Sequence, residues 1–132
     1  MKRIMLDTNI VSHFVKGLPA VDARVLAVPM ASLCISVITE AELLYGLAKR
    51  PQAKRLASTV HEFLQRVDVL PWNSSLTDRY GIVRTDLENR GKTLGDLDLL
   101  IAVHALDIGA VLATSDQAFH YVEGLQTEDW TR

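Results

Sequence analysis

The chain has 132 residues, of which 48% are hydrophobic and 23% are charged. This length and composition are typical of one globular domain, residues 1–132, and exclude a disordered tail, a collagen-like chain or a disulfide-stapled miniprotein. The formal net charge of -2 excludes a protein that coats nucleic acid through an overall basic surface, but it is compatible with a nucleic-acid enzyme that has a local basic patch.

Cys34 is the only cysteine, so no disulfide can form within the chain, and its apolar neighbours indicate a buried, inert thiol. Near the N-terminus, Asp7 interrupts the apolar run too early for a secretory signal. The later apolar stretch at residues 99–113 is too short to span a bilayer. We therefore expect a cytoplasmic protein that is not inserted in a membrane.

Short apolar runs alternate with longer stretches of helical period, a pattern typical of a parallel sheet covered by helices. Strands are predicted at residues 3–6, 33–36, 67–70, 110–113 and, with a weaker pattern, 125–127. Helices are predicted at residues 8–15, 21–28, 37–49, 52–66, 75–88 and 96–108. The predicted fold class is therefore α/β, with a central, mainly parallel sheet of four to five strands.

The last predicted helix, residues 96–108, is apolar around nearly its whole circumference. Such a helix is buried on several sides, either within the protein or at an interface between subunits. We therefore interpret His104 as a core or interface histidine, while the carboxylate of Asp98 in the first turn needs a separate explanation.

Four acidic residues are predicted to meet at one end of the sheet. Asp7 and Asp116 follow predicted strands, Asp98 begins the buried helix, and Glu42 lies early in the helix after the second strand. In an open parallel sheet, ligands bind outside the carboxyl ends of the strands. Carboxylates gathered there repel one another, and a divalent cation with oxygen ligands offsets that repulsion. Mg²⁺ fits best, with Mn²⁺ as the alternative, because the sequence has no His or Cys cluster.

Each acid also has an ordinary structural interpretation. Asp7 is a good helix N-cap, and Asp98 and Asp116 are acids of the kind that helix N-termini stabilise. Only their joint position at the end of one sheet favours a metal site.

Two neighbouring acids leave the choice of residue open. Glu42 closes a possible capping box with Thr39, and the helical pattern does not choose between Glu40 and Glu42. Asp96 competes with Asp98 in the same way, and we expect Asp96 to be the N-cap of its helix.

In four segments the sequence resembles the PIN-domain ribonucleases, specifically the VapC-type toxins of bacterial toxin-antitoxin pairs. The segments are Met-Leu-Asp-Thr-Asn at residues 5–9, Ile-Thr-Glu-Ala-Glu-Leu-Leu-Tyr-Gly at 38–46, Gly-Asp-Leu-Asp-Leu-Leu-Ile-Ala at 95–102 and Leu-Ala-Thr-Ser-Asp at 112–116. Any one of them is a weak signal, but four in this order and spacing are strong, and the resemblance runs nearly end to end.

The resemblance implies a three-layer α/β/α sandwich and a Mg²⁺-dependent endoribonuclease. Its catalytic metal ligands would correspond to Asp7, Glu42, Asp98 and Asp116, which selects Glu42 over Glu40 and Asp98 over Asp96. Asp7 and Asp98 are expected to bind the metal directly, whereas Glu42 and Asp116 bind a second ion or orient the water. Thr8 and Ser115 are expected to donate hydrogen bonds that hold the acids in place.

The resemblance also implies a substrate and two partners. The substrate is structured RNA, with tRNA anticodon stem-loops as the leading class, so that cleavage inhibits translation. A cognate antitoxin neutralises the enzyme, and a second copy of the chain forms a homodimer. The basic run Lys49, Arg50, Lys54 and Arg55 is the candidate RNA contact, although a solvated helix end is its simpler interpretation.

Two rival functions remain at this stage. The first is a catalytically inactive PIN-like scaffold that binds RNA or protein, against which the four intact acids argue. The second is a receiver-like domain in which an Asp accepts phosphate, but that chemistry requires a late Lys and the sequence has none beyond Lys92.

Overall fold

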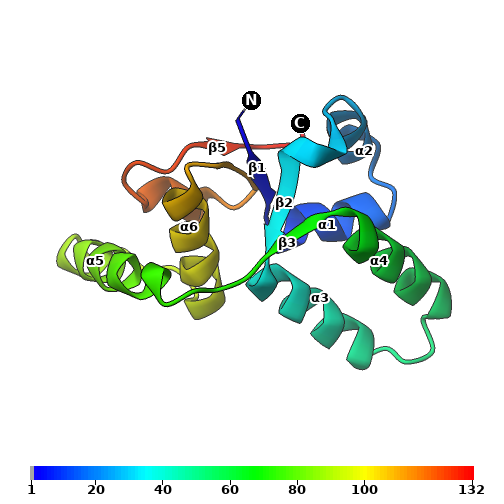
Figure 1. The fold of residues 1–132 in the computed structure, drawn as a ribbon, viewed down its shortest axis with the longest axis horizontal. Coiled ribbons are helices and arrows are strands. Elements are labelled where there is room, and N and C mark those ends of the chain that lie inside the picture. Colours follow the sequence, from blue (N-terminus) through cyan, green and yellow to red (C-terminus); the bar gives the residue numbers. More distant parts are fainter. Residues whose placement is uncertain (1) are drawn as a thin grey trace.

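The computed structural model of the protein describes residues 2–132 and contains one five-stranded sheet in which every neighbouring pair of strands is parallel (Figure 1). The strands are β1 (Ile4–Leu6), β2 (Leu33–Ser36), β3 (Asp68–Leu70), β4 (Val111–Ala113) and β5 (Thr127–Glu128), in the spatial order β3-β2-β1-β4-β5. The predicted parallel sheet is therefore confirmed.

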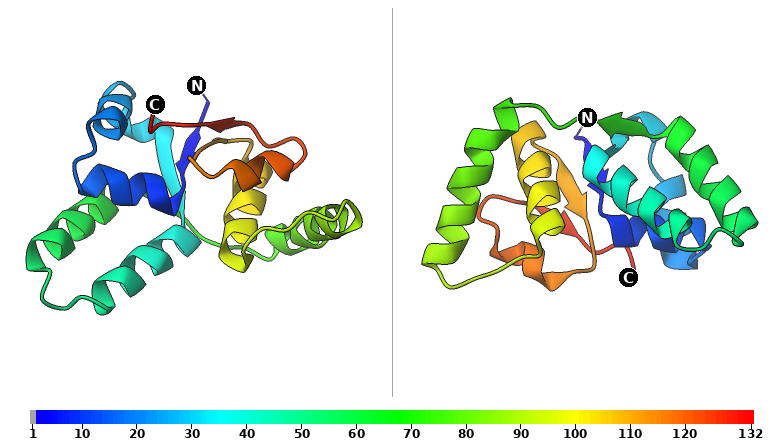
Figure 2. Two further views of the ribbon diagram at one scale, coloured as in Figure 1. Left: turned by 180° about the vertical axis from the view of Figure 1, so that it is seen from behind. Right: turned by 90° about the horizontal axis from the view of Figure 1, so that it is seen from below.

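Helices cover both faces of this sheet, as the views in Figure 2 show. They are α1 (Thr8–Val15), α2 (Pro19–Leu26), α3 (Val37–Ala48), α4 (Lys54–Arg66), α5 (Ser75–Asn89) and α6 (Asp96–Ile108), with short 3₁₀ turns η1 (Met30–Ser32) and η2 (Gln117–Tyr121). Helices α1, α2 and α4 pack on one face, and α5 and α6 pack on the other. This arrangement confirms the predicted three-layer α/β/α sandwich.

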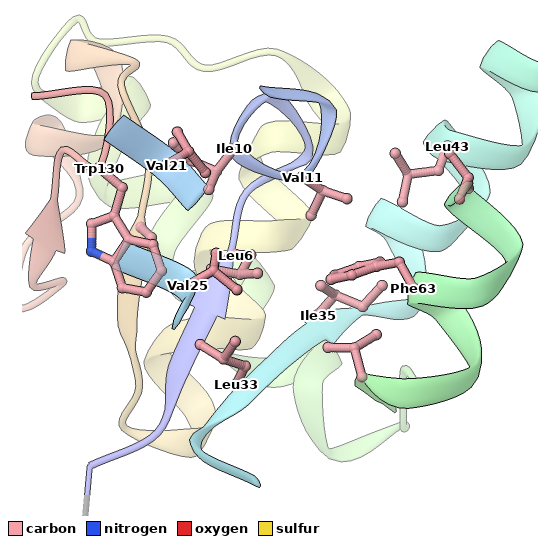
Figure 3. Packing of buried hydrophobic residues seen from close by; sticks show 13 residues of the cluster. Leu6, Ile10, Val11, Val21, Val25, Leu33, Ile35, Leu43, Phe63 and Trp130 are labelled. Carbon is pink, nitrogen blue, oxygen red and sulfur yellow. The ribbon is translucent and has the colours of Figure 1, made fainter. Parts of the chain in front are cut away.

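The strands contribute to two separate cores because successive side chains point to opposite faces of a sheet. Leu6, Leu33 and Ile35 pack with α1, α2 and α4 (Figure 3), whereas Met5 and Cys34 pack against α5 and α6. Burial on both faces explains why the strands are continuous apolar runs in the sequence. Burial also raises the pKa of the Cys34 thiol to about 11, as expected for an inert cysteine.

Helix α6 is buried within the protein, as its apolar character indicates. His104 in its middle is a core residue: its Nδ1 lies 2.8 Å from the Oγ of Ser36, and its ring packs edge-on against Trp72. Burial lowers the pKa of His104, so the ring is neutral at physiological pH. No helix within residues 2–132 is both long enough and apolar enough to cross a membrane.

The predicted cap at Asp96 is wrong and the possible capping box at Thr39 is not formed, although both helices are present. Gly95, and not Asp96, is the N-cap of α6, because the extended backbone that an N-cap adopts is found at Gly95. Ser36 caps α3 by accepting a hydrogen bond from the Ile38 N–H at 3.1 Å, so no capping box forms between Thr39 and Glu42. Strand β2 leads directly into α3, which begins at Val37 as predicted.

Smaller differences have local causes. Helix α2 begins two residues earlier than predicted, at Pro19, because proline is well suited to the first position of a helix. Helix α4 begins two residues later than predicted, because residues 51–52 form a turn. Strand β5 is also displaced toward the C-terminus, where Glu128 pairs with Ala113.

A pair of glycine substitutions compares the left-handed position at the end of α6 with the interior of another helix. Gly109 ends α6 with a φ of +68°, where an alanine Cβ is strained, so Gly109→Ala should lower the free energy of unfolding by about 1 kcal/mol. Gly81 lies inside α5 with open space around it, so Gly81→Ala should raise that free energy by about 1 kcal/mol. Urea denaturation of both variants checks this; equal effects of the same sign would contradict it.

Candidate active site

The candidate site lies at the carboxyl ends of the two adjacent strands β1 and β4. From β1 the chain builds the sheet outward through β2 and β3 on one side, and later adds β4 and β5 on the other. In parallel sheets, ligands bind at the point where the strand order reverses in this way. Asp7 directly follows β1, and its N–H donates to the Ala113 carbonyl at the end of β4 at 3.0 Å.

Asp7 is almost completely buried, with 3% of its surface exposed. Its Oδ1 accepts a hydrogen bond from the Thr8 N–H at 2.8 Å, which makes Asp7 the N-cap of α1. Its Oδ2 accepts a hydrogen bond from the Thr114 hydroxyl, also at 2.8 Å. Burial and the nearby charges of Asp98 and Glu42 nevertheless raise the pKa of Asp7 to about 6. Asp7 is therefore both a helix cap and a member of the acidic cluster.

Glu42 is held beside Asp7 by the side chain of Thr8. The Thr8 hydroxyl donates to Glu42 Oε1 at 2.6 Å and is hydrogen-bonded to the buried Thr39 hydroxyl at 3.2 Å. Of the two acids in this part of α3, it is Glu42 whose negative charge acts on Asp7 and on Asp98.

Asp98 connects the remaining acids. It lies in the first turn of α6, half-buried, and burial together with the charges of Asp116 and Glu42 raises its pKa. Asp98 also acts on Asp7, so electrostatic interactions link the four carboxylates at this end of the sheet. The four carboxylates come from four separate segments: the β1–α1 junction, helix α3, the first turn of α6 and the β4–η2 junction.

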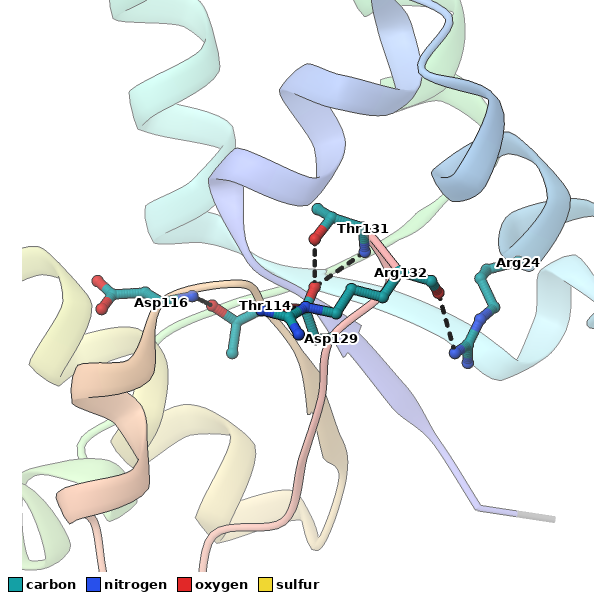
Figure 4. A network of polar contacts seen from close by, with 6 residues as sticks. All are labelled: Arg24, Thr114, Asp116, Asp129, Thr131 and Arg132. Atoms are coloured by element: carbon teal, nitrogen blue, oxygen red, sulfur yellow. Dashed lines mark hydrogen bonds and ion pairs between the residues drawn. The ribbon is translucent and has the colours of Figure 1, made fainter.

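Asp116 joins this group through the β4–η2 junction. Its N–H donates to the Thr114 hydroxyl oxygen at 3.1 Å (Figure 4), and its Oδ1 accepts from the Ala118 N–H at 2.9 Å. Thr114 therefore links Asp7 to Asp116. The sequence predicts such a hydrogen bond from Ser115, but within residues 2–132 the side chain that provides it at this junction is that of Thr114.

No basic side chain neutralises these acids in the part of the chain that the structure describes. The ion pairs there involve other carboxylates, such as Asp68 with Arg3 and Asp86 with Arg90. Among the same residues, no three Asp, Glu, His or Cys side chains form a group that could hold a metal ion as they stand. The donor set consists of carboxylate oxygens, which suits a hard cation such as Mg²⁺ that binds through one or two carboxylates and retains several waters.

The basic residues divide into two pairs. Lys49 and Arg50 follow α3 and line a groove that reaches Thr8 and Glu42. Lys54 and Arg55 lie in the first turn of α4, exposed, and are not part of the lining of this groove.

Residues 4–125 match the family model described as the PIN domain. A tRNA(fMet)-specific endonuclease VapC from Shigella flexneri is 34% identical over 132 residues, covering 99% of this chain and all of the relative. A ribonuclease VapC2 from Haemophilus influenzae is 33% identical over 131 residues, covering 98% of this chain and 99% of the relative. The chain belongs to the VapC ribonucleases of the PIN-domain family. The resemblance carried by the four sequence segments is thereby confirmed, and the protein is an enzyme that cleaves RNA.

The solved structures agree with this assignment. A chain in the crystal structure of DNA-bound VapBC from Salmonella typhimurium matches with a TM-score of 0.90 and 32% identity, covering 98% of this chain and 99% of that chain. A chain in the structure of VapBC2 from Rickettsia felis bound to a promoter DNA fragment matches with a TM-score of 0.86, 32% identity and coverage of 95% and 96%.

Substitution of Asp7 should change how stability depends on pH. Because the folded-state pKa of Asp7 is raised above its ordinary value of 3.8 to about 6, its stabilising contribution is present below pH 3.8 and is lost as the pH rises through 6. Without divalent metal at pH 7.5, Asp7→Asn should therefore be more stable than the wild type, by up to about 3 kcal/mol. At pH 4 this advantage should largely disappear.

Urea denaturation in EDTA at the two pH values measures this effect. Asp96→Asn, which changes an exposed acid at the start of α6, is the control and should show little difference between the two pH values. An Asp7→Asn variant that is equally destabilised at both would contradict the prediction.

The two hydrogen bonds of the Thr114 hydroxyl can be tested separately from the volume of its side chain. Thr114→Val removes the donor to Asp7 and the acceptor for the Asp116 N–H, so it should destabilise the protein by about 1–3 kcal/mol and raise the pKa of Asp7 further. Thr114→Ser keeps the hydroxyl and should preserve that pKa. NMR titration of the Asp7 carboxyl carbon distinguishes the two variants; the same pKa in both would contradict the assigned role.

Proposed function

We propose that the protein is a Mg²⁺-dependent endoribonuclease toxin that cleaves structured RNA, first of all tRNA, in the cytoplasm and thereby inhibits translation. The observation that carries this proposal is the group of four carboxylates at the end of the parallel sheet, with no basic side chain of residues 2–132 paired to it. Carboxylates gathered in this way repel one another, and a bound divalent cation offsets that repulsion.

Asp7 and Asp98 are the residues that would hold Mg²⁺, with Mn²⁺ as a substitute. When bound, the ion would lower the pKa of a water molecule and neutralise charge on the phosphate oxygens. Thr8 and Thr114 fix the carboxylates by hydrogen bonds, so that little rearrangement is required on binding. Glu42 and Asp116, on either side, would orient the attacking water and accept its proton, or hold a second ion.

The proposed substrate follows from the relatives and from the surface beside the acids. The Shigella flexneri relative is named for its action on tRNA(fMet), so this tRNA is the first substrate to test. A protein of this size reads RNA through exposed loop bases and backbone shape, which makes an anticodon stem-loop a suitable target. Lys49, Arg50, Lys54 and Arg55 are proposed to contact its phosphates.

Two protein partners complete the proposal. The structural relatives are named as VapBC pairs, and we propose that a cognate antitoxin likewise covers the acidic group of this chain. We also propose a homodimer, because α3 and α6 expose apolar side chains that a second copy would cover: 64% of Tyr45, 46% of Leu97 and 39% of Leu44 are exposed.

Cleavage assays with matched pairs of variants test the activity. Asp98→Asn and Glu42→Gln should each lower the cleavage rate of tRNA about 100-fold or more, because losing even a hydrogen-bond partner of a metal ligand costs roughly 10- to 100-fold. Asp96→Asn and Glu40→Gln remove a neighbouring acid from the same helix and should change the rate less than about threefold.

Discrete tRNA fragments that require Mg²⁺ and are abolished by EDTA are the expected result. Folded, metal-loaded protein that binds RNA without cleaving it would instead identify an inactive scaffold. Equal losses in both members of a pair would contradict the assignment of Asp98 or Glu42.

Metal binding should also appear as a change in stability. A ligand that binds only the folded state raises the free energy of unfolding, by about 2.7 kcal/mol at a concentration 100 times its Kd. Saturating Mg²⁺ should therefore raise the Tm of the wild type and of Asp96→Asn but leave Asp7→Asn nearly unchanged. A rise of the same size in all three would place the bound ion elsewhere.

A further inference from the structure

We propose that a groove between α1, α3 and α4 binds an RNA phosphate that flanks the cleaved one, through Lys16, Lys49 and Arg50. This inference rests on the proposed nuclease function and adds to it Lys16, which the sequence pattern did not single out, and a role for Gly46.

The groove includes one member of the acidic group, Glu42, together with Lys16, Lys49 and Arg50. The rest of its lining is largely apolar and includes Val15, Leu43, Leu47, Leu56 and Val60. Its volume is about 170 Å³, which is smaller than the roughly 300 Å³ or more of a typical small-molecule pocket. The groove therefore has room for one phosphate group of an RNA chain whose neighbouring phosphate lies at the acids.

The three basic residues lie at the C-terminal ends of two helices. Lys16 is the C-cap of α1, Lys49 is the C-cap of α3, and Arg50 follows it. All three are exposed, and within residues 2–132 none forms an ion pair with an acidic side chain. The Lys49 Nζ lies 4.6 Å from the centre of the Tyr45 ring, which directs it without neutralising it.

Gly46 is the feature that the fold itself does not require. It lies in the interior of α3, where glycine costs about 1 kcal/mol of stability relative to alanine. Its φ is not positive, and a Cβ at this position would have no atom within 4 Å. Neither backbone conformation nor close packing therefore calls for glycine. Because Gly46 lines the groove, the missing side chain leaves space there for a ligand.

An RNA backbone fits the charges better than a protein segment does. The acids repel the phosphates on both sides of the cleaved bond, so binding of the substrate requires cations close to the site. Each phosphate that a Lys or Arg neutralises also releases counterions and strengthens binding at low salt. Lys16, Lys49 and Arg50, which form no ion pair within residues 2–132 and line the same groove as Glu42, supply both effects.

Binding of a fluorescent tRNA(fMet) transcript, measured by anisotropy in EDTA over a range of salt concentrations, tests the cationic contacts without any cleavage. Lys16→Ala and the double variant Lys49→Ala/Arg50→Ala should weaken binding, the double variant about tenfold, and should lower the salt slope by about 0.7 for each phosphate that is no longer neutralised. Lys2→Ala, at the opposite end of β1, is the charge-matched control and should keep the wild-type slope.

A second pair of variants tests the space rather than the charge. Gly46→Gln fills the groove without adding or removing charge, and Gly81→Gln makes the same change in α5, where no groove is filled. Both should raise the Tm, because glutamine favours helices more than glycine does. Only Gly46→Gln should weaken tRNA binding and raise the KM for cleavage, with kcat changed less.

The outcomes separate this inference from the proposed function. Unchanged tRNA affinity and salt slope in Lys16→Ala, in the double variant and in Gly46→Gln would show that the groove does not bind RNA. A protein segment would then be its occupant. Loss of affinity in these variants, in a protein that cleaves no RNA, would support the groove while contradicting the nuclease.

Discussion

Burial is unfavourable for an ionised carboxylate, and Asp7 is almost completely buried at the end of β1. Two other acids act on it, yet the hydrogen bonds from Thr8 and Thr114 keep its pKa from rising further than about 6. The sheet makes this arrangement unavoidable: β1 lies at its centre, and both adjacent strands end at the same edge. Helices α1, α3 and α6 begin near that edge, and their N-termini favour negative charge there.

The charge distribution beyond Asp7 follows from the direction of the same helices. Asp7 and Asp98 lie where α1 and α6 begin, Glu42 lies inside α3, and basic residues are found where α1 and α3 end. One groove includes Glu42 together with the basic residues Lys16, Lys49 and Arg50. Such a surface matches a substrate that carries regularly spaced negative charges and reacts at one of them. The helices that follow the strands therefore position both the acids of the site and the basic residues proposed to bind the substrate.

The sequence predicted the sheet well because its strands are buried on both faces and are therefore uninterrupted apolar runs. It also placed Asp7 and Asp116 correctly after their strands, since that position depends only on the chain order. The choice between Glu40 and Glu42 depends on how α3 is rotated, which the burial of Thr39 and Leu43 decides. Local patterns could not predict this, nor that Gly95 replaces Asp96 as a cap, because both depend on tertiary contacts. The role of Thr114 likewise depends on the pairing of β1 with β4, which brings together residues 107 positions apart.

The central claim is that the acids at the ends of β1 and α6 hold a divalent cation. Anomalous diffraction from crystals soaked in Mn²⁺ tests it most directly, because the signal locates the ion without reference to activity. The account predicts one strong peak in contact with both Asp7 and Asp98, which disappears in crystals of Asp98→Asn. Strong peaks only at other acids, in crystals of an enzyme that still cleaves RNA with Mn²⁺, would contradict it.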